Sequence, residues 1–158
     1  MLFGEVTDLK LRPAGTEDVE RLFAWRNHPD VRAVSRSGDP LDFGSHERWY
    51  ASATRDPNIL IWIGLDERGN PVGMVRAQRE SEGCASAELS IVVDPARQGQ
   101  GFGGSLIILA EGEIRRSWPS VRMIEAEVLS HNPGSLRLFE RVGFVQRSTW
   151  LTKEIGQG

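Results

Sequence analysis

Residues 92–105 read VVDPARQGQGFGGS, and this stretch holds four glycines in six residues, from Gly99 to Gly104. Glycine has no side chain to obstruct the main chain, so successive N–H groups can turn toward one point. We expect a helix to begin directly afterwards, and its free N–H groups and its dipole act at the same place. An apolar strand, a glycine loop and a helix start in this order predict a binding site for phosphate.

Two common phosphate loops do not fit this stretch. Gly99, Gly101 and Gly104 have the spacing of the dinucleotide fingerprint. That fingerprint requires a glycine immediately after the strand, whereas residues 94–98 intervene here, and the chain after Gly104 is too short for a doubly wound domain. A Walker loop is excluded because the chain has no Gly-Lys-Ser/Thr sequence.

The rest of the chain predicts alternating strands and helices. We expect strands over residues 7–12, 58–65, 71–79, 85–93, 121–129 and 144–153, and helices over residues 16–26, 43–53, 104–118 and 133–142. The three central strands read as an antiparallel meander, and the later strand–helix–strand unit should be parallel and right-handed. We therefore expect one mixed α/β domain over residues 1–154, followed by a short tail at 155–158.

Composition excludes several classes of protein. The chain has 158 residues, of which 39% are apolar and 26% charged, the balance of a soluble globular protein. No apolar run approaches the roughly 20 residues that span a bilayer, and residues 1–10 lack the pattern of a signal peptide. The single cysteine, Cys84, excludes an internal disulfide and a cysteine zinc cluster. With a net charge of −3, we expect a cytoplasmic protein without nucleic-acid, membrane or metal partners.

A different spacing in the glycine stretch, Gln98-x-x-Gly101-x-Gly103, resembles the pyrophosphate loop of the GCN5-related N-acetyltransferase (GNAT) family. Residues 87–93, AELSIVV, are similar to the strand that precedes that loop in the family. Residues 131–144, HNPGSLRLFERVGF, resemble the family's Asn-x-x-Ser-x-x-x-Tyr/Phe-x-x-x-Gly-Phe segment. The joint match is more specific than any one motif.

The resemblance covers about residues 8–150 and implies the family's fold. The expected fold is a mixed, mostly antiparallel sheet of six or seven strands, flanked by about four helices and splayed between the fourth and fifth strands. The resemblance also implies an activity, the transfer of acetyl from acetyl-CoA to a primary amine that attacks the thioester directly.

The resemblance implies a set of CoA-binding residues in one strand, the glycine loop and the two later helices. These residues are Ile91, Val92, Val93, Gln98, Gly99, Gln100, Gly101, Phe102, Gly103, Gly104, Asn132, Ser135 and Phe139. Main-chain groups of residues 91–93 would bind the pantetheine arm like an additional strand. A backbone N–H in the same strand would stabilise the oxyanion of the reaction.

Direct attack requires a neutral amine, so a carboxylate or a positioned water must accept its proton. Glu88 is the first candidate base, on the strand face expected to meet the acceptor, and His46 is the second. Asn132 is expected to position CoA or a water while it caps the helix that starts at residue 133. Phe139 stands where many family members have Tyr, so water protonates the CoA thiolate or the thiolate leaves unaided.

The first third of the chain resembles the GNAT subgroup that acetylates nucleotide-linked amino sugars, as in pseudaminic-acid-type pathways. The similar pieces are Trp-Arg-Asn at 25–27, Val-Arg at 31–32 and His-x-x-Trp at 46–49. The implied acceptor-binding residues are Arg26, Asn27, Arg32, His46 and Trp49. Two alternatives stay open: acetylation of a protein N-terminus, as in ribosomal-protein alanine acetyltransferases, and a non-catalytic acyl-CoA sensor. The habit of the family also suggests a homodimer.

Overall fold

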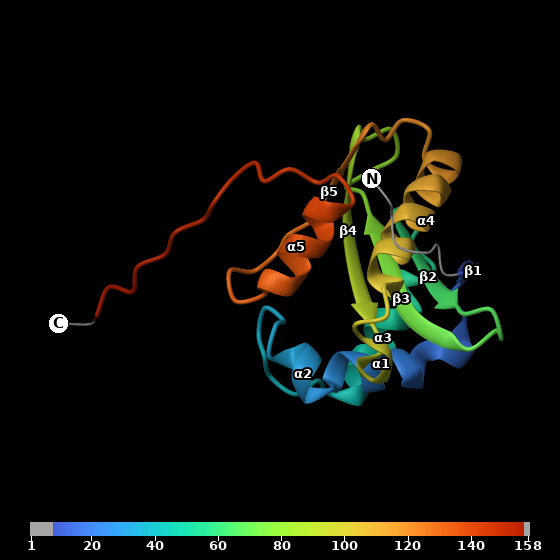
Figure 1. Cartoon of the computed structure of the whole chain (residues 1–158), viewed down its shortest axis with the longest axis horizontal. Helices are drawn as coiled ribbons and strands as arrows, with labels where there is room; N and C mark the ends of the chain where they lie inside the picture. The colour runs from blue at the N-terminus through green and yellow to red at the C-terminus, as the bar shows by residue number, and fades with distance from the viewer. Residues whose placement is uncertain (1–7, 157–158) are drawn as a thin grey trace.

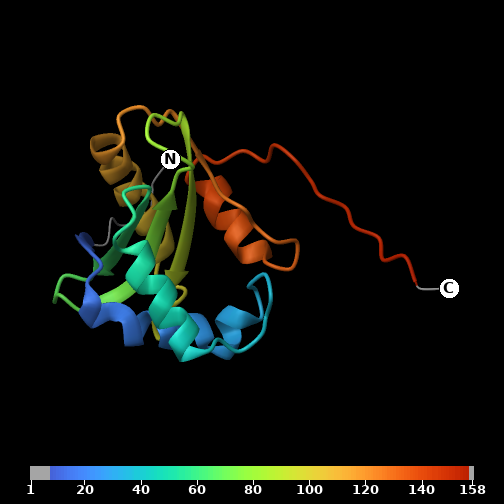
Figure 2. The ribbon, with the colours of Figure 1, turned by 180° about the vertical axis from the view of Figure 1, so that it is seen from behind.

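The computed structural model describes residues 8–156, which form a central sheet with helices on both faces (Figures 1 and 2). The sheet has the order β1-β2-β3-β4-β5. Its strands are β1 (Lys10–Pro13), β2 (Ile59–Leu65), β3 (Pro71–Gln78), β4 (Ser86–Val93) and β5 (Met123–Glu125). Neighbouring strands are antiparallel except for β4 and β5, which are parallel. The predicted mixed, mostly antiparallel sheet is confirmed.

Helices cover the sheet on two sides and create two cores. They are α1 (Val19–Asn27), α2 (Pro29–Arg32), α3 (Phe43–Ala53), α4 (Phe102–Ser117) and α5 (Pro133–Arg141), with 3₁₀ turns η1 (Thr16–Asp18) and η2 (Pro95–Arg97). One core packs α4 and α5 against the sheet, and the other packs α1 and α3 against the opposite face.

Alternation along β4 decides which side chains reach each core. Ala87 and Leu89 are buried in the core beneath α4, whereas Val92 packs against the core beneath α1 and α3. Successive side chains of a strand point to opposite faces, so Glu88 and Ser90 lie on the same face as Val92. The predicted grouping of these residues is confirmed, and they face the α1–α3 side.

Local capping signals account for the helices that the sequence predicted well. The Asp42 carboxylate accepts a hydrogen bond from Ser45 N at 2.8 Å, and α3 has the predicted bounds. The Asn132 side chain accepts one from Ser135 N at 3.2 Å at the start of α5. Such bonds satisfy N–H groups that a helix start leaves without partners.

The prediction of six or seven strands is wrong for the part of the chain that the structure describes, because the sheet has five. The strand expected over 121–129 is reduced to β5, and the strand expected over 144–153 does not form. Phe144 packs against the core, and residues 145–156 leave the body after it (Figure 1), so Trp150 and Leu151 are 89% and 90% exposed. A strand forms by hydrogen bonding to a neighbouring strand. β5 has only three residues, so it offers residues 144–153 few main-chain groups for pairing.

The N-terminal helical region also differs from the expectations. The helix expected over 16–26 begins as the 3₁₀ turn η1, and the short helix α2 was not predicted. Part of the strand expected over 7–12 and of the tail expected at 155–158 lies outside the described residues.

In residues 8–156, no helix is long and apolar enough to cross a membrane. The same residues hold no group of three or more His, Cys, Asp or Glu side chains that could bind a metal ion.

Candidate active site

Residues 98–101 of the glycine stretch form an exposed loop between η2 and α4, and residues 102–105 are the start of α4. Gly99 and Gly101 have φ values of +77° and +83°, and Gly101 is the N-cap residue of α4. Only glycine adopts this left-handed conformation readily. Within residues 8–156, the N–H groups of Gln98, Gly99, Gln100 and Gly101 donate to no acceptor. Free N–H groups at a helix start fit a pyrophosphate, so the loop suits CoA.

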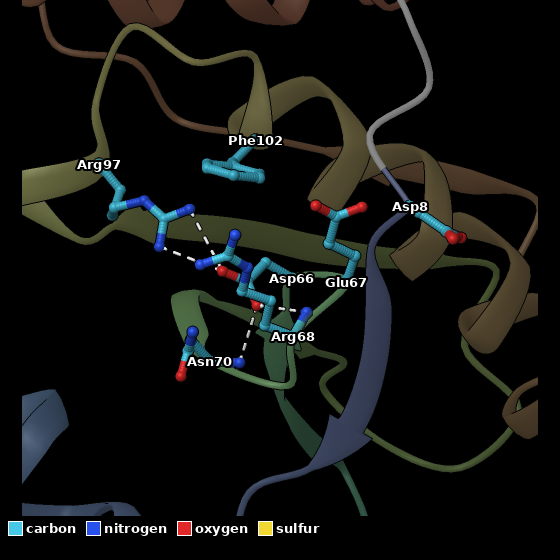
Figure 3. Close-up of a pocket in the computed structure, with 7 residues that line it drawn as sticks. All are labelled: Asp8, Asp66, Glu67, Arg68, Asn70, Arg97 and Phe102. Carbon is cyan, nitrogen blue, oxygen red and sulfur yellow. Dashed lines mark hydrogen bonds and ion pairs between the residues drawn. The ribbon is translucent and has the colours of Figure 1, made fainter.

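Two carboxylates fix η2, the segment that leads into this loop. The Asp94 side chain accepts a hydrogen bond from Ala96 N at 2.9 Å. The Arg97 guanidinium lies 3.3 Å from the Asp66 carboxylate, in the turn between β2 and β3, and 5.0 Å from the centroid of the Phe102 ring (Figure 3). Hydrogen bonds from the backbone, first from Asn70, and the Arg97 contact hold the pKa of Asp66 below its usual value.

A cavity of about 480 Å³ lies between this turn, η2 and the start of α4 (Figure 3). Its wall includes Asp66, Arg68, Asn70, Arg97 and Phe102. Sequence reasoning missed Asp66 and Arg97, because their contact joins residues that are far apart in the chain. An Asp in a turn next to Gly69 was the only available signal, and it indicates a turn rather than a site.

Some residues expected to bind CoA instead contribute to packing. A Cβ atom on the buried Gly103 would lie 2.7 Å from a methyl carbon of Leu138, so this glycine lets α4 and α5 approach closely. Phe139 is buried in the core, with its ring centroid 4.9 Å from that of Phe144. Gly104 faces the same helix contact. These placements do not favour direct side-chain contacts of Phe139 with CoA.

β4 has an open edge beside the loop. It pairs with β5 at Ser86, Ala87 and Glu88, and beyond that point β3 is its one strand partner within residues 8–156. The two strands therefore part where splaying was expected, and in the described part of the chain no strand pairs with residues 89–93 on that side, which leaves room for an extended ligand. The predicted pantetheine-binding residues 91–93 lie in this stretch.

A second cavity, of about 190 Å³, lies on the α1–α3 side of β4. Its walls come from the region of α1 and α2, from α3, and from β3 and β4: Arg26, Val31, Ser35, Trp49, Met74, Arg76, Ser90 and Val92. We call it the arginine pocket. It brings together the predicted acceptor residues Arg26 and Trp49 and adds Arg76, which sequence reasoning missed. A lone Arg in an otherwise apolar strand was the available signal.

Two guanidinium groups meet in the arginine pocket. That of Arg26 lies 4.9 Å, and that of Arg76 5.6 Å, from the centroid of the Trp49 ring. Burial lowers the pKa of Arg26, and the charge of Arg76 lowers it further. Burial also lowers the pKa of Arg76, while the nearby Glu88 carboxylate opposes that change. Both groups stay protonated at neutral pH because the pKa of arginine starts so high.

Glu88 and Asn132 have different surroundings. The Glu88 side chain is exposed on the strand face of Ser90 and Val92, which line the arginine pocket. Asn132 accepts the hydrogen bond from Ser135 N that starts α5. Its catalytic role stays a prediction.

Three predicted acceptor residues lie outside the walls of the pocket. Asn27 Oδ1 accepts a hydrogen bond from Leu41 N at 2.8 Å, and Arg32 Nε donates one to the Asn27 carbonyl at 3.1 Å. These bonds shape the chain between α1 and α3. His46 is 5% exposed, and its Nε2 lies 3.1 Å from the Val19 carbonyl oxygen.

The surroundings of His46 are those of a packed core residue. Its ring lies among Phe23, Trp49 and Tyr50, with centroid distances of 5.6, 5.8 and 6.2 Å. Burial lowers its pKa, the hydrogen bond to Val19 opposes that change, and the charge of Arg26 adds to it. This placement does not favour His46 as the base or as an acceptor contact.

Comparison with known proteins adds family information to this geometry. A family model described as "Acetyltransferase (GNAT) domain" matches residues 8–145. A Bacillus subtilis protein named "Putative phosphinothricin acetyltransferase YwnH" is 28% identical over 144 residues, which cover 87% of this chain and 85% of that protein.

Solved structures share the fold. Spermidine N-acetyltransferase from Vibrio cholerae, in complex with CoA and spermine, has a TM-score of 0.79 and 23% identity over 95% of this chain and 88% of that chain. A domain from Methanocaldococcus jannaschii has a TM-score of 0.78 and 24% identity over 91% of this chain and 92% of that chain. At these identities the likeness shows the fold alone.

Proposed function

Because the chain belongs to the GNAT acetyltransferase family and is an acetyl-CoA-dependent N-acetyltransferase, we propose that a small primary amine enters through the arginine pocket and reacts beside β4. The observation that carries this proposal is the position of Val92. Val92 lines the arginine pocket and also belongs to the open edge of β4 that leads into the glycine loop. An acceptor in the pocket and a cosubstrate along that edge therefore meet at the same strand.

In the proposed reaction the amine nitrogen attacks the thioester carbonyl carbon, forming the C–N bond. Collapse of the tetrahedral intermediate breaks the C–S bond, and a backbone N–H of β4 stabilises the oxyanion before that step. Glu88 accepts the proton of the amine, directly or through a water, and a water protonates the CoA thiolate. The support for Glu88 is its exposed carboxylate on the strand face that lines the pocket.

For the acceptor we propose a nucleotide-linked amino sugar as the first candidate to assay. Arg26 and Arg76 offer donors suited to phosphate, and the Trp49 ring offers a face for a sugar. The names of the relatives and structural neighbours add phosphinothricin and spermidine to the panel. Protein N-termini and a non-catalytic acyl-CoA sensor are the remaining alternatives.

A thiol-release assay with acetyl-CoA tests these acceptors. The panel contains UDP-amino sugars, their free amino sugars, phosphinothricin, spermidine and N-terminal peptides. Selective turnover of a UDP-amino sugar supports the first candidate, and selective turnover of peptides contradicts it. CoA binding without thiol release from any acceptor favours the sensor.

Replacement of Glu88 tests the proposed base. Glu88→Gln should lower kcat by about 10²- to 10⁴-fold, the range of general base catalysis, because an amide cannot accept the proton. The KM for acetyl-CoA should not change. The control is Glu20→Gln, which removes the same charge from an exposed position on α1. Wild-type turnover of Glu88→Gln would leave a water as the base.

A further inference from the structure

We infer that the acceptor amine carries an oxyanion, of the carboxylate or phosphoryl type, and that this group binds Arg26 and Arg76 in the arginine pocket. The inference rests on the proposed function, because it names the chemical class that the proposed acceptor site selects. It adds Arg76 to the residues that determine specificity.

The first support is that neither guanidinium has a hydrogen-bond or ion-pair partner in residues 8–156, although both lie over the Trp49 ring. Across residues 8–156, the side chains of Arg26 and Arg76 form no hydrogen bond and no ion pair within 4 Å. Each guanidinium presents five N–H donors in a planar fork. Both side chains are partly buried, and yet all these donors point to no acceptor of the described chain.

The second support is the surplus of positive charge. Both guanidinium groups lie over the Trp49 ring, and the charge of Arg76 lowers the pKa of Arg26, as expected for two like charges that repel. The Glu88 carboxylate raises the pKa of Arg76 and offsets one positive charge of the two. Binding of an oxyanion would remove the repulsion and give both forks an acceptor.

The third support is that the two cations are already held in position. Both guanidinium groups lie within 6 Å of the Trp49 ring centroid, the range of cation–π attraction. The side chains come from α1, α3 and β3, which are fixed by the core beneath α1 and α3. A ligand therefore binds without the cost of ordering two long flexible side chains.

The dimensions of the pocket limit the part of the acceptor inside it. Its volume of about 190 Å³ is below the roughly 300–1,000 Å³ of pockets that enclose drug-sized ligands. A group the size of an amino acid fits inside, and any larger part extends into solvent. The oxyanion then lies at the arginines and the amine toward Glu88 and Ser90. A polyamine would bring further positive charge to the same place.

Matched pairs of acceptors test the inference with the wild-type protein. The pairs are β-alanine with β-alaninamide, 2-aminoethylphosphonate with ethanolamine, and a UDP-amino sugar with its free amino sugar; spermidine is the polyamine control. We expect kcat/KM to be at least about 30-fold higher for the anionic member of one pair, as charge-assisted hydrogen bonds to two arginines would give. The pair that shows the difference identifies the oxyanion as carboxylate, phosphonate or diphosphate.

Variants test whether the arginines cause that difference. Arg26→Gln and Arg76→Gln should each lower kcat/KM for the anionic member by about 10- to 100-fold, leave the neutral member nearly unchanged, and leave the KM for acetyl-CoA unchanged. The control is Arg55→Gln, which removes an exposed arginine outside the pocket. Thermal unfolding of each variant shows whether it is folded.

Calorimetry on the CoA-loaded protein separates failure of this inference from failure of the proposed function. Binding of an anionic member that Arg76→Gln abolishes, without turnover of any amine, supports the inference and contradicts the proposed activity. Turnover in which neutral amines or spermidine equal or exceed every anionic member overturns the inference and leaves the acetyltransferase proposal intact. Absence of both binding and turnover for all anionic members also overturns it.

Discussion

Two sets of arginines contact the layer formed by η1, α1 and α3, and their surroundings differ completely. Arg12 donates two hydrogen bonds to the Asp18 carboxylate, at 2.7 and 2.8 Å, and Asp18 is 0% exposed. Arg26 and Arg76 meet no carboxylate within 4 Å in residues 8–156. The arginine that stabilises the fold is paired with a carboxylate, whereas the two arginines beside the open edge of β4 are available to bind a ligand.

The paired cluster is a complete network. Asp18 also accepts a hydrogen bond from Gly15 N at 2.8 Å, and the Tyr50 hydroxyl donates to the Gly15 carbonyl. Burial raises the pKa of Asp18, but the bonds from Arg12 and Gly15 outweigh it and hold the pKa below its usual value. Burial raises the pKa of Tyr50 to about 12. These contacts fix the start of the helix that carries Arg26.

The largest effect expected from this comparison concerns stability. Arg12→Gln removes both hydrogen bonds that Arg12 donates to the buried Asp18 carboxylate and leaves it with the more distant Arg21, at 3.8 Å, which should lower the free energy of unfolding by about 3 kcal/mol. Arg26→Gln breaks no hydrogen bond or ion pair of residues 8–156 and loses the cation–π contact with Trp49, so it should change the free energy of unfolding by about 1 kcal/mol or less. Urea unfolding of both variants measures the difference. Equal losses would mean that the arginine pocket also holds the fold.

A smaller effect is expected at the glycine loop, where the donors without acceptors are main-chain N–H groups. Gly101→Ala adds a methyl group to a left-handed residue and to the surface that meets the pyrophosphate, so the KM for acetyl-CoA should rise about 10-fold or more. Gly112→Ala is the control, because Gly112 lies inside α4 with no atom within 4 Å of its new Cβ. An unchanged KM in Gly101→Ala would separate the loop from CoA binding.

The smallest effect is expected at His46, a titratable group of the same layer that faces the core. Its folded-state pKa is lower than the 6.5 of the unfolded chain. As pH falls through 6.5 the unfolded state binds the proton first, so stability decreases between about pH 7.5 and 5.5, by about 1 kcal/mol or less. Urea unfolding at the two pH values, with and without His46→Gln, isolates this loss. A slope that persists in His46→Gln would assign it to another group.

Features encoded by neighbouring residues were predicted correctly. Asp42 with Ser45, and Asn132 followed by Pro133, mark the starts of α3 and α5, because a cap needs only a side chain and an N–H three residues away. The glycine loop before α4 was visible for the same reason. Because side chains alternate between the two faces of a strand, the sequence of β4 alone predicted that Glu88 and Val92 share a face.

Features that depend on distant residues were missed. The sequence of residues 144–153 is typical of a strand, but a strand there would have to pair with a neighbour. β5 is too short to provide that pairing. The Asp66–Arg97 contact and the hydrogen bond from Tyr50 to the Gly15 carbonyl likewise required the sheet and helices to be in place. A contact between two residues that are tens of positions apart cannot be predicted from the residues next to each of them in the sequence.

The sequence by itself determined the backbone site: glycines at two left-handed positions, a helix start after them and an apolar strand before them. These are local conformational preferences, and they need no tertiary contact to be read. Only the tertiary structure decided the side-chain site, because Arg26, Trp49 and Arg76 meet through packing of α1 and α3 on the sheet. The same packing buried His46, a plausible base by sequence, and left two arginines without a carboxylate of residues 8–156 within 4 Å beside the reacting strand.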